Sequence, residues 1–154
     1  MPQTPTEDHN FACRINALSR EVQAATARLL EPYGVTPAQA LMLYELAHGQ
    51  TSPTVIAQNM AVDASNLSRM IRLLGDRGLL VREVDDANRT RVAVKLTPEG
   101  RKLARRIDPH AAVMQDVITG ALTDAERRAL SRGLTKLTDA LRRTRSMRDH
   151  PAAG

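Results

Sequence analysis

Residues 54–77 read TVIAQNMAVDASNLSRMIRLLGDR, and this stretch decides the fold. Its beginning predicts a short helix that buries Val55, Ile56 and Met60. After a tight link, a second helix has apolar residues at positions i, i+3, i+4 and i+7, which lie on one side of a helix. Those residues are Leu67, Met70, Ile71 and Leu74. Two helices joined by so short a link predict a helix-turn-helix.

The opposite face of the second helix carries small polar and cationic side chains. They are Ser65, Asn66, Ser68, Arg69 and Arg72. Hydroxyl, amide and guanidinium groups are the ones that hydrogen-bond base edges and phosphates in duplex DNA. A polar outward face is equally typical of an ordinary surface helix, so this segment alone leaves both interpretations open.

Residues 79–96 predict one β-hairpin in an otherwise helical chain. Every second residue from Val92 to Leu96 is apolar, which is the period of a half-buried strand, and the stretch from Leu79 to Val84 predicts its partner. A hairpin next to a helix-turn-helix is a wing. Arg89 and Arg91 near its tip are therefore candidates to enter the minor groove. The alternative is a solvated hairpin with incidental charge.

Long helices are predicted at both ends of the chain. From Phe11 to Leu29 apolar residues recur at alternating spacings of four and three, the stripe of a helix that packs along another helix. Two more helices are predicted after Pro98 and after Thr123, the first with a bend at Pro109 and the second with a heptad-like leucine stripe.

Four helix starts carry capping residues. Thr36 and Thr123 begin capping boxes, with Gln39 and Glu126 as their third following residues. Ser52, which precedes a proline, and Asp63 are further N-cap candidates.

The composition limits the class of protein. The chain has 154 residues, enough for one domain with a sizeable core, and a net charge of +5, which favours a polyanionic partner. Aromatic residues make up 2%, which disfavours recognition of single strands by ring stacking. The single cysteine, Cys13, excludes an internal disulfide. Without a bilayer-spanning apolar run or a signal peptide, we expect a cytoplasmic protein with no membrane partner.

From about Phe11 to Leu141 the chain resembles the MarR family. The resemblance rests on VTPAQAL at 35–41, LLGDRGLL at 73–80 and VKLTPEG at 94–100, in this order. It implies a mostly α fold with one β-hairpin. The implied organisation is a single domain, 1–154, with a winged helix-turn-helix lobe at about 36–100 and dimerisation helices at about 11–31 and 101–146.

The resemblance also implies a function. A MarR-type protein is a homodimeric, sequence-specific transcription regulator of double-stranded DNA, commonly a repressor, with a pseudo-palindromic operator whose half-sites lie about one helical turn apart. The implied phosphate contacts are Ser52 and Thr54. The implied major-groove and phosphate contacts are Ser65, Asn66, Ser68, Arg69 and Arg72. The family's wing usually has Asp-x-Arg, but Asn88 and Thr90 stand at those positions here, so Arg89 or Arg91 would have to replace it.

Members of the family often respond to small phenolic or aromatic acids bound between the dimer helices and the DNA-binding lobe. The candidates for such a site here are Phe11, Arg14, Tyr33, Met42, Tyr44 and His48. We expect a phenolic carboxylate to weaken DNA binding. The alternative for each of these residues is a structural role.

Other classes of function compete with this one. Cys13 near the start of the first helix resembles the thiol of the family's peroxide sensors, although the tyrosines that flank such a thiol are missing. A winged-helix protein-interaction module is disfavoured, because the exposed face from Ser65 to Arg72 has no apolar anchor. Scattered histidines, with no phosphate loop and no nucleophile–base set, predict no enzyme, no cofactor and no metal.

Overall fold

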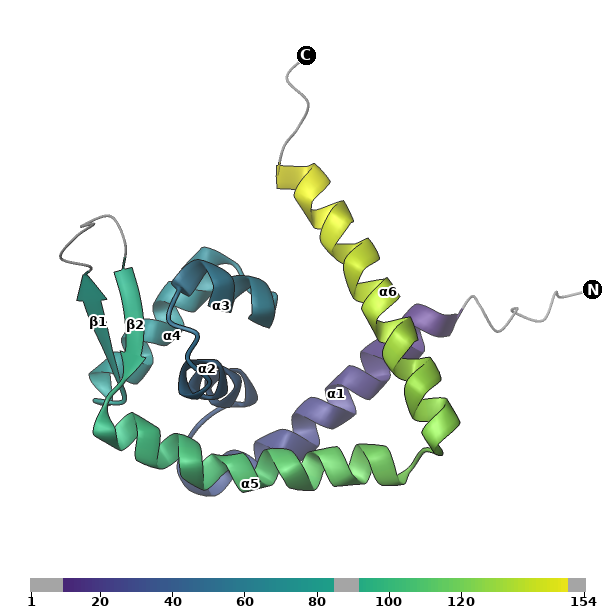
Figure 1. Ribbon diagram of the computed structural model, residues 1–154, viewed down its shortest axis with the longest axis horizontal. Coiled ribbons are helices and arrows are strands. Elements are labelled where there is room, and N and C mark those ends of the chain that lie inside the picture. The colour runs from purple at the N-terminus through teal and green to yellow at the C-terminus, as the bar shows by residue number, and fades with distance from the viewer. Residues whose placement is uncertain (1–9, 85–91, 150–154) are drawn as a thin grey trace, which may run out of the picture. The chain divides into compact units, whose positions relative to one another are not determined.

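The computed structural model describes residues 10–84 and 92–149, and Figure 1 shows their arrangement. The elements in chain order are α1 (Phe11–Leu30), the 3-10 turn η2 (Glu31–Tyr33), α2 (Pro37–Ala47), α3 (Pro53–Met60), α4 (Ala64–Asp76), β1 (Leu80–Val84), β2 (Val92–Leu96), α5 (Pro98–Gly120) and α6 (Asp124–Asp149). In the described part, the chain is mostly helical with one antiparallel hairpin, which confirms the predicted fold class. It forms two compact units that divide between Ala112 and Val113.

Side-chain caps set the beginnings of α2 and α4. Thr36 Oγ1 accepts from the Gln39 N–H at 3.2 Å, and the Thr36 N–H donates to Gln39 Oε1 at 3.0 Å, which confirms the predicted capping box. Asp63 accepts from the Asn66 N–H at 2.8 Å and caps α4. Ser52 is the N-cap residue of α3 and Pro53 occupies the first turn, as predicted, but the Ser52 side chain makes no cap hydrogen bond.

The turn of the helix-turn-helix is made at Ala61. Its φ of 53° is left-handed, which stops α3 because a helix cannot continue through that conformation. The Val62 N–H donates to the Ala57 carbonyl at 3.0 Å and closes the turn. The chain then reaches Asp63 in an extended conformation, ready to cap α4.

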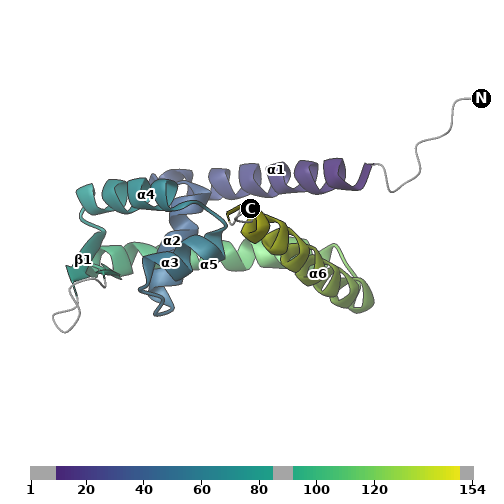
Figure 2. The same ribbon diagram turned by 90° about the horizontal axis from the view of Figure 1, so that it is seen from above.

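The core of the first unit is aliphatic, as the low aromatic content predicts. Its buried residues are Leu30, Val35, Met42, Leu43, Leu46, Ile56, Leu67, Ile71, Leu74, Leu79, Leu80, Val94, Leu96 and Ile107. They come mainly from α2, α3, α4 and the hairpin. Helix α2 packs against α3, which is next to it in Figure 2, and against β2. Full burial of one such side chain stabilises the fold by about 1.5–3 kcal/mol.

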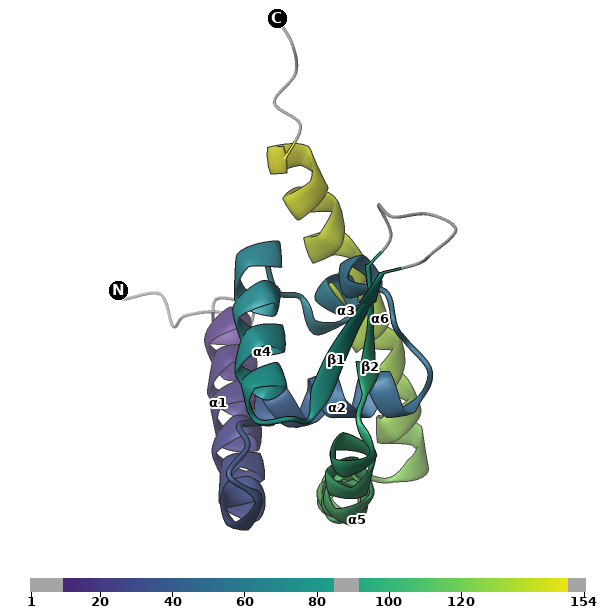
Figure 3. The same ribbon diagram turned by 90° about the vertical axis from the view of Figure 1, so that its left-hand side faces the viewer.

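The hairpin lies beside α4 (Figure 3). Leu80 is opposite Leu96 and Arg82 is opposite Val94, so these four residues project from one face of the two-stranded sheet. The Val94 N–H donates to the Thr51 carbonyl at 2.9 Å, which joins β2 to the loop before α3. The hairpin is thus fixed to the loop before α3 by a backbone hydrogen bond, in addition to the packing of its apolar face.

The motif at 94–100 closes the hairpin onto α5. Thr97 Oγ1 donates to the Gly78 carbonyl at 2.7 Å and accepts from the Gly100 N–H at 3.0 Å. A Cβ atom added to Gly100 would lie 2.0 Å from the Leu79 carbonyl oxygen, so only glycine permits this approach of α5 to the residues before β1.

Helix α5 runs through Pro109 without ending (Figure 1). Proline has no N–H, so the carbonyl of Arg105, four residues earlier, has no partner from Pro109 in the helix. The bend predicted at this proline remains a prediction.

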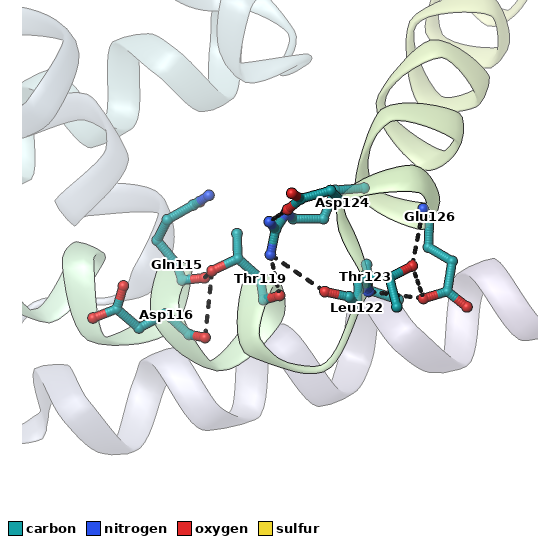
Figure 4. A network of polar contacts seen from close by, with 8 residues as sticks. Gln115, Asp116, Thr119, Leu122, Thr123, Asp124 and Glu126 are labelled. Atoms are coloured by element: carbon teal, nitrogen blue, oxygen red, sulfur yellow. Dashed lines mark hydrogen bonds and ion pairs between the residues drawn. The ribbon is translucent and has the colours of Figure 1, made fainter.

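The second unit consists of the end of α5 and α6, which meet in a capped turn (Figure 4). The Thr123 N–H donates to Glu126 Oε2 at 2.8 Å, and the Glu126 N–H donates back to Thr123 Oγ1 at 3.4 Å, which confirms the second capping box. Arg127 pairs with Asp124 and donates to the Thr119 carbonyl at 2.8 Å. Within the described side chains, α6 has no buried residue.

Candidate DNA-binding surface

Helix α4 divides into a buried apolar face and an exposed polar one. Leu67, Ile71 and Leu74 are at most 5% exposed and hold the helix in the core. The predicted reading residues, from Ser65 to Arg72, are all exposed on the other side. The residue types and the exposure of this face therefore agree with the prediction made from the 3.6-residue period.

The first turn of α4 already uses part of the hydrogen-bonding capacity of Asn66. Its side-chain amide donates to Asp63 Oδ2 at 2.7 Å, in addition to the backbone bond to the same carboxylate. The hydrogen bond from the Asn66 backbone is the largest cause that lowers the pKa of the Asp63 carboxyl below its usual value. Asn66 is therefore held by the cap, while the hydroxyls of Ser65 and Ser68 have no partner among the described residues.

A groove of about 750 Å³ lies between α4 and β1. Arg69 and Arg72 line it from α4, and Arg82 lines it from β1. None of these three guanidiniums has a hydrogen bond or ion pair with the residues in 10–84 and 92–149. Asp76 at the end of α4 is an acidic member of the lining. The groove is thus cationic, with three arginines against one carboxylate.

Arg82 was not among the residues that the sequence predicted for this surface. A signal was present, because strand alternation assigns position 82 to the same face as Leu80 and therefore to the core. A cation at a core position of an amphipathic strand is the anomaly that could have drawn attention to it.

Of the remaining predicted DNA contacts, the structure describes two. Ser52 is half-buried and Thr54 exposed, both at the beginning of α3. Arg89 and Arg91 lie outside the described residues, as do Asn88 and Thr90.

The six candidate ligand residues are dispersed through the first unit. Met42 is fully buried in the core, while Phe11 and Arg14 lie on the exposed beginning of α1. Tyr44 and His48 are one turn apart on α2, with ring centroids 4.0 Å apart, and line a hollow of about 320 Å³. These five residues do not line one pocket together with the sixth candidate, Tyr33, whose side chain contacts α5.

Tyr33, the last residue of η2, contacts α5. Its hydroxyl lies 2.8 Å from His110 Nε2, and the Arg106 guanidinium lies 5.2 Å from the centre of its ring. On the other side, Arg77 at the end of α4 donates to the Gly34 carbonyl at 2.8 Å. Arg106 and His110 were not predicted, although their spacing of four residues places them on one side of a helix.

Neither a metal site nor a membrane span is found among the described residues. Within residues 10–84 and 92–149, no group of three or more histidine, cysteine and acidic side chains could hold a metal ion. No helix in this part combines the length and apolarity needed to cross a membrane. Cys13 is an exposed free thiol on α1.

Comparison with known proteins relates part of the chain to one family. The model of the MarR family matches residues 33–89, from η2 through α4 and β1. The structure that explains regulation of DNA binding of BpsR from Bordetella bronchiseptica by 6-hydroxynicotinic acid is 27% identical, with a TM-score of 0.79, over 90% of this chain and 99% of BpsR. Residues 33–89 of the chain are thus similar in sequence to the MarR family. The cationic groove lies within the matched segment.

Two curated relatives are each 32% identical to the chain over the matched residues. One, from Thauera aromatica, is assigned to transcriptional regulation of the hcr operon and matches over 98 residues, 63% of this chain and 59% of the relative. The other is the HTH-type transcriptional repressor MdtR of Bacillus subtilis (strain 168), matched over 56% of each chain. The chain therefore spans less than two thirds of the length of either relative.

Proposed function

We propose that this chain is a homodimeric, sequence-specific regulator of transcription that binds double-stranded DNA in the cytoplasm and acts as a repressor. The observation that carries the proposal is the exposed face of α4, where hydroxyls and guanidiniums without a partner among the described residues stand opposite the buried Leu67, Ile71 and Leu74. Its named relatives are regulators rather than enzymes, and MdtR is a repressor. We accordingly propose no catalytic step, cofactor or metal for it.

In the proposed complex, α4 enters the major groove. The hydroxyls of Ser65 and Ser68 and the guanidinium of Arg69 face the base edges, and an arginine can bind guanine O6 and N7 together. Ser52 and Thr54, at the beginning of α3, contact phosphates. Arg89 and Arg91 contact the neighbouring minor groove.

A second copy of the chain covers the terminal helices in this proposal. Their exposed large apolar residues are Phe11, Ile15, Leu18, Val113, Val117, Ile118, Leu130, Leu134, Leu137 and Leu141. So much exposed apolar surface on three helices is typical of an interface rather than of a monomer. A two-fold dimer presents two α4 helices and matches a pseudo-palindromic operator.

We further propose that a small phenolic or aromatic acid releases the DNA. BpsR, whose DNA binding is regulated by 6-hydroxynicotinic acid, supports this class of effector. Of the residues predicted for the effector, Tyr33 has a histidine and an arginine beside it, both able to meet a carboxylate. Unchanged DNA affinity across a panel of such acids would contradict this part. If peroxide is the signal instead, Cys13→Ser should abolish the release.

The first experiment is a fluorescence-anisotropy titration with the DNA upstream of the protein's own gene and with random duplex, at two salt concentrations. We expect wild type to prefer the upstream DNA and Arg69→Ala to lose about tenfold or more in affinity for it, the cost of one base contact of about 1–3 kcal/mol.

Arg28→Ala is the matched control, because Arg28 is also exposed but lies on α1. The proposed function would be overturned if wild type bound the upstream and random duplexes equally and also bound duplexes selected from a random library no better than random DNA.

A further inference from the structure

We propose that Arg82 of β1 and Arg72 of α4 together bind a phosphate of the DNA strand that borders the major groove on the hairpin side. This inference rests on the proposed function. It assigns a ligand, the phosphodiester backbone, to the groove between α4 and β1. It also gives Arg82 a function, whereas neither its position in the strand nor its neighbours give a structural reason for a charged residue there.

The position of Arg82 is unusual for a charged residue. It lies opposite Val94, which has no exposed surface, and two residues from the buried Leu80 on the same face of the hairpin. Alternation would therefore put an apolar side chain at 82. Arg82 is nevertheless exposed, because it lies where this face extends into the groove beside α4.

The charges around Arg82 leave it free for an anion. It has no hydrogen bond or ion pair among the described residues. Its neighbour Glu83 is on the opposite face of the hairpin, where it pairs with Lys95. Asp76 is the acidic residue that lines the groove, against the guanidiniums of Arg69, Arg72 and Arg82.

The geometry of duplex DNA brings a phosphate to this place. A helix in the major groove has a sugar–phosphate strand on each side of it. The hairpin packs beside α4, so one of these strands has to pass over the groove between them. Guanidiniums bind phosphate oxygens in bidentate fashion, and two from different elements can hold one phosphate from two sides.

A phosphate contact and a base contact differ in a measurable way. Loss of a phosphate contact weakens binding to all sequences equally and lowers the slope of log K against log salt by about 1. Loss of a base contact changes sequence preference. The test therefore measures Arg82→Gln for affinity, salt slope and the ratio of specific to random binding.

Lys95→Gln is the matched control, because it removes the same charge from the same hairpin on the opposite face. The probe is the best duplex selected by wild type from a random library. A second set of duplexes carries one neutral methylphosphonate at a time along the strand.

We expect Arg82→Gln to bind about three- to tenfold more weakly to every duplex, with a salt slope lower by about 1, and Lys95→Gln to keep the wild-type slope. One methylphosphonate position should weaken wild type and leave Arg82→Gln unaffected. Circular dichroism melting confirms that both variants are folded.

The phosphate assignment would be overturned, while the proposed function stands, if Arg82→Gln and Lys95→Gln had the same affinity and salt slope. A change in the sequence preference of Arg82→Gln without a change in its salt slope would also overturn it. Wild type that binds no duplex in preference to random DNA would overturn both.

Discussion

At the scale of single residues, Gly100 is the described glycine at which an added Cβ atom would meet the closest neighbour. A Cβ atom there would lie 2.0 Å from the Leu79 carbonyl oxygen, a backbone atom that cannot turn away. We expect Gly100→Ala to lower the free energy of unfolding by about 3 kcal/mol or more, because either α5 or the residues before β1 must move.

Gly75 supplies the control for that measurement. It lies inside α4, and its nearest neighbour to an added Cβ is the Leu80 carbonyl oxygen at 3.9 Å, an ordinary contact. Gly75→Ala should raise the free energy of unfolding by about 0.5–1 kcal/mol through helix propensity. Urea denaturation of both variants gives the comparison; equal stability of the two would contradict the steric argument.

Local residue chemistry was predictable where it depends on neighbours along the chain. The caps at Thr36, Asp63 and Thr123 form because donor and acceptor are three residues apart. The same logic fails at Ser52, whose side-chain oxygen makes no cap bond although its residue type favours one. Arg82 escaped prediction because its significance lies in the groove beside α4, not in its neighbours along the strand.

At the scale of elements, Tyr33 is the connection between η2 and α5. Its hydroxyl meets His110 Nε2 at 2.8 Å in a partly buried position, 77 residues away in sequence. We expect Tyr33→Phe to cost about 0.5–1.5 kcal/mol in the free energy of unfolding, the net value of one hydrogen bond.

A double-mutant cycle with His110→Ala measures whether the two side chains act together. The coupling energy should be about 0.5–1.5 kcal/mol, and costs that simply add would mean that the hydrogen bond does not stabilise the protein. Denaturation at one fixed protein concentration keeps any association constant across the four proteins.

The elements themselves were largely predictable, because periods of 3.6 and 2 residues identify which side is buried. The exposed face of α4 and the inward side of β2 agree with those periods. The stripe predicted on α1 is only partly buried in the chain, and Leu30, outside that stripe, is the residue that enters the core. Contacts such as Tyr33 with His110 have no local signal, because the fold alone brings them together.

At the scale of the whole molecule, the terminal helices expose apolar residues that the chain itself does not cover. Leu141 of α6 is 71% exposed. In the proposed dimer, burying a leucine contributes about 2 kcal/mol in each chain, so Leu141→Glu should raise the dimer dissociation constant by more than tenfold.

Arg132→Glu is the control, on the opposite side of the same helix, where an acidic residue should leave association unchanged. Sedimentation velocity over a range of concentrations measures both variants. Monomeric wild type at every concentration would contradict the dimer, as would equal dissociation constants for the two variants.

The arginine at position 82 also implies a conflict between folding and binding. A valine there would extend the apolar face formed by Leu80 and Val94, and β-branched residues are well accommodated in strands. Laboratory selection for thermal stability alone would then favour the substitution Arg82→Val, at the expense of affinity for DNA. A heat-resistant form of this protein obtained in that way would be a well-folded domain with a weakened hold on its operator.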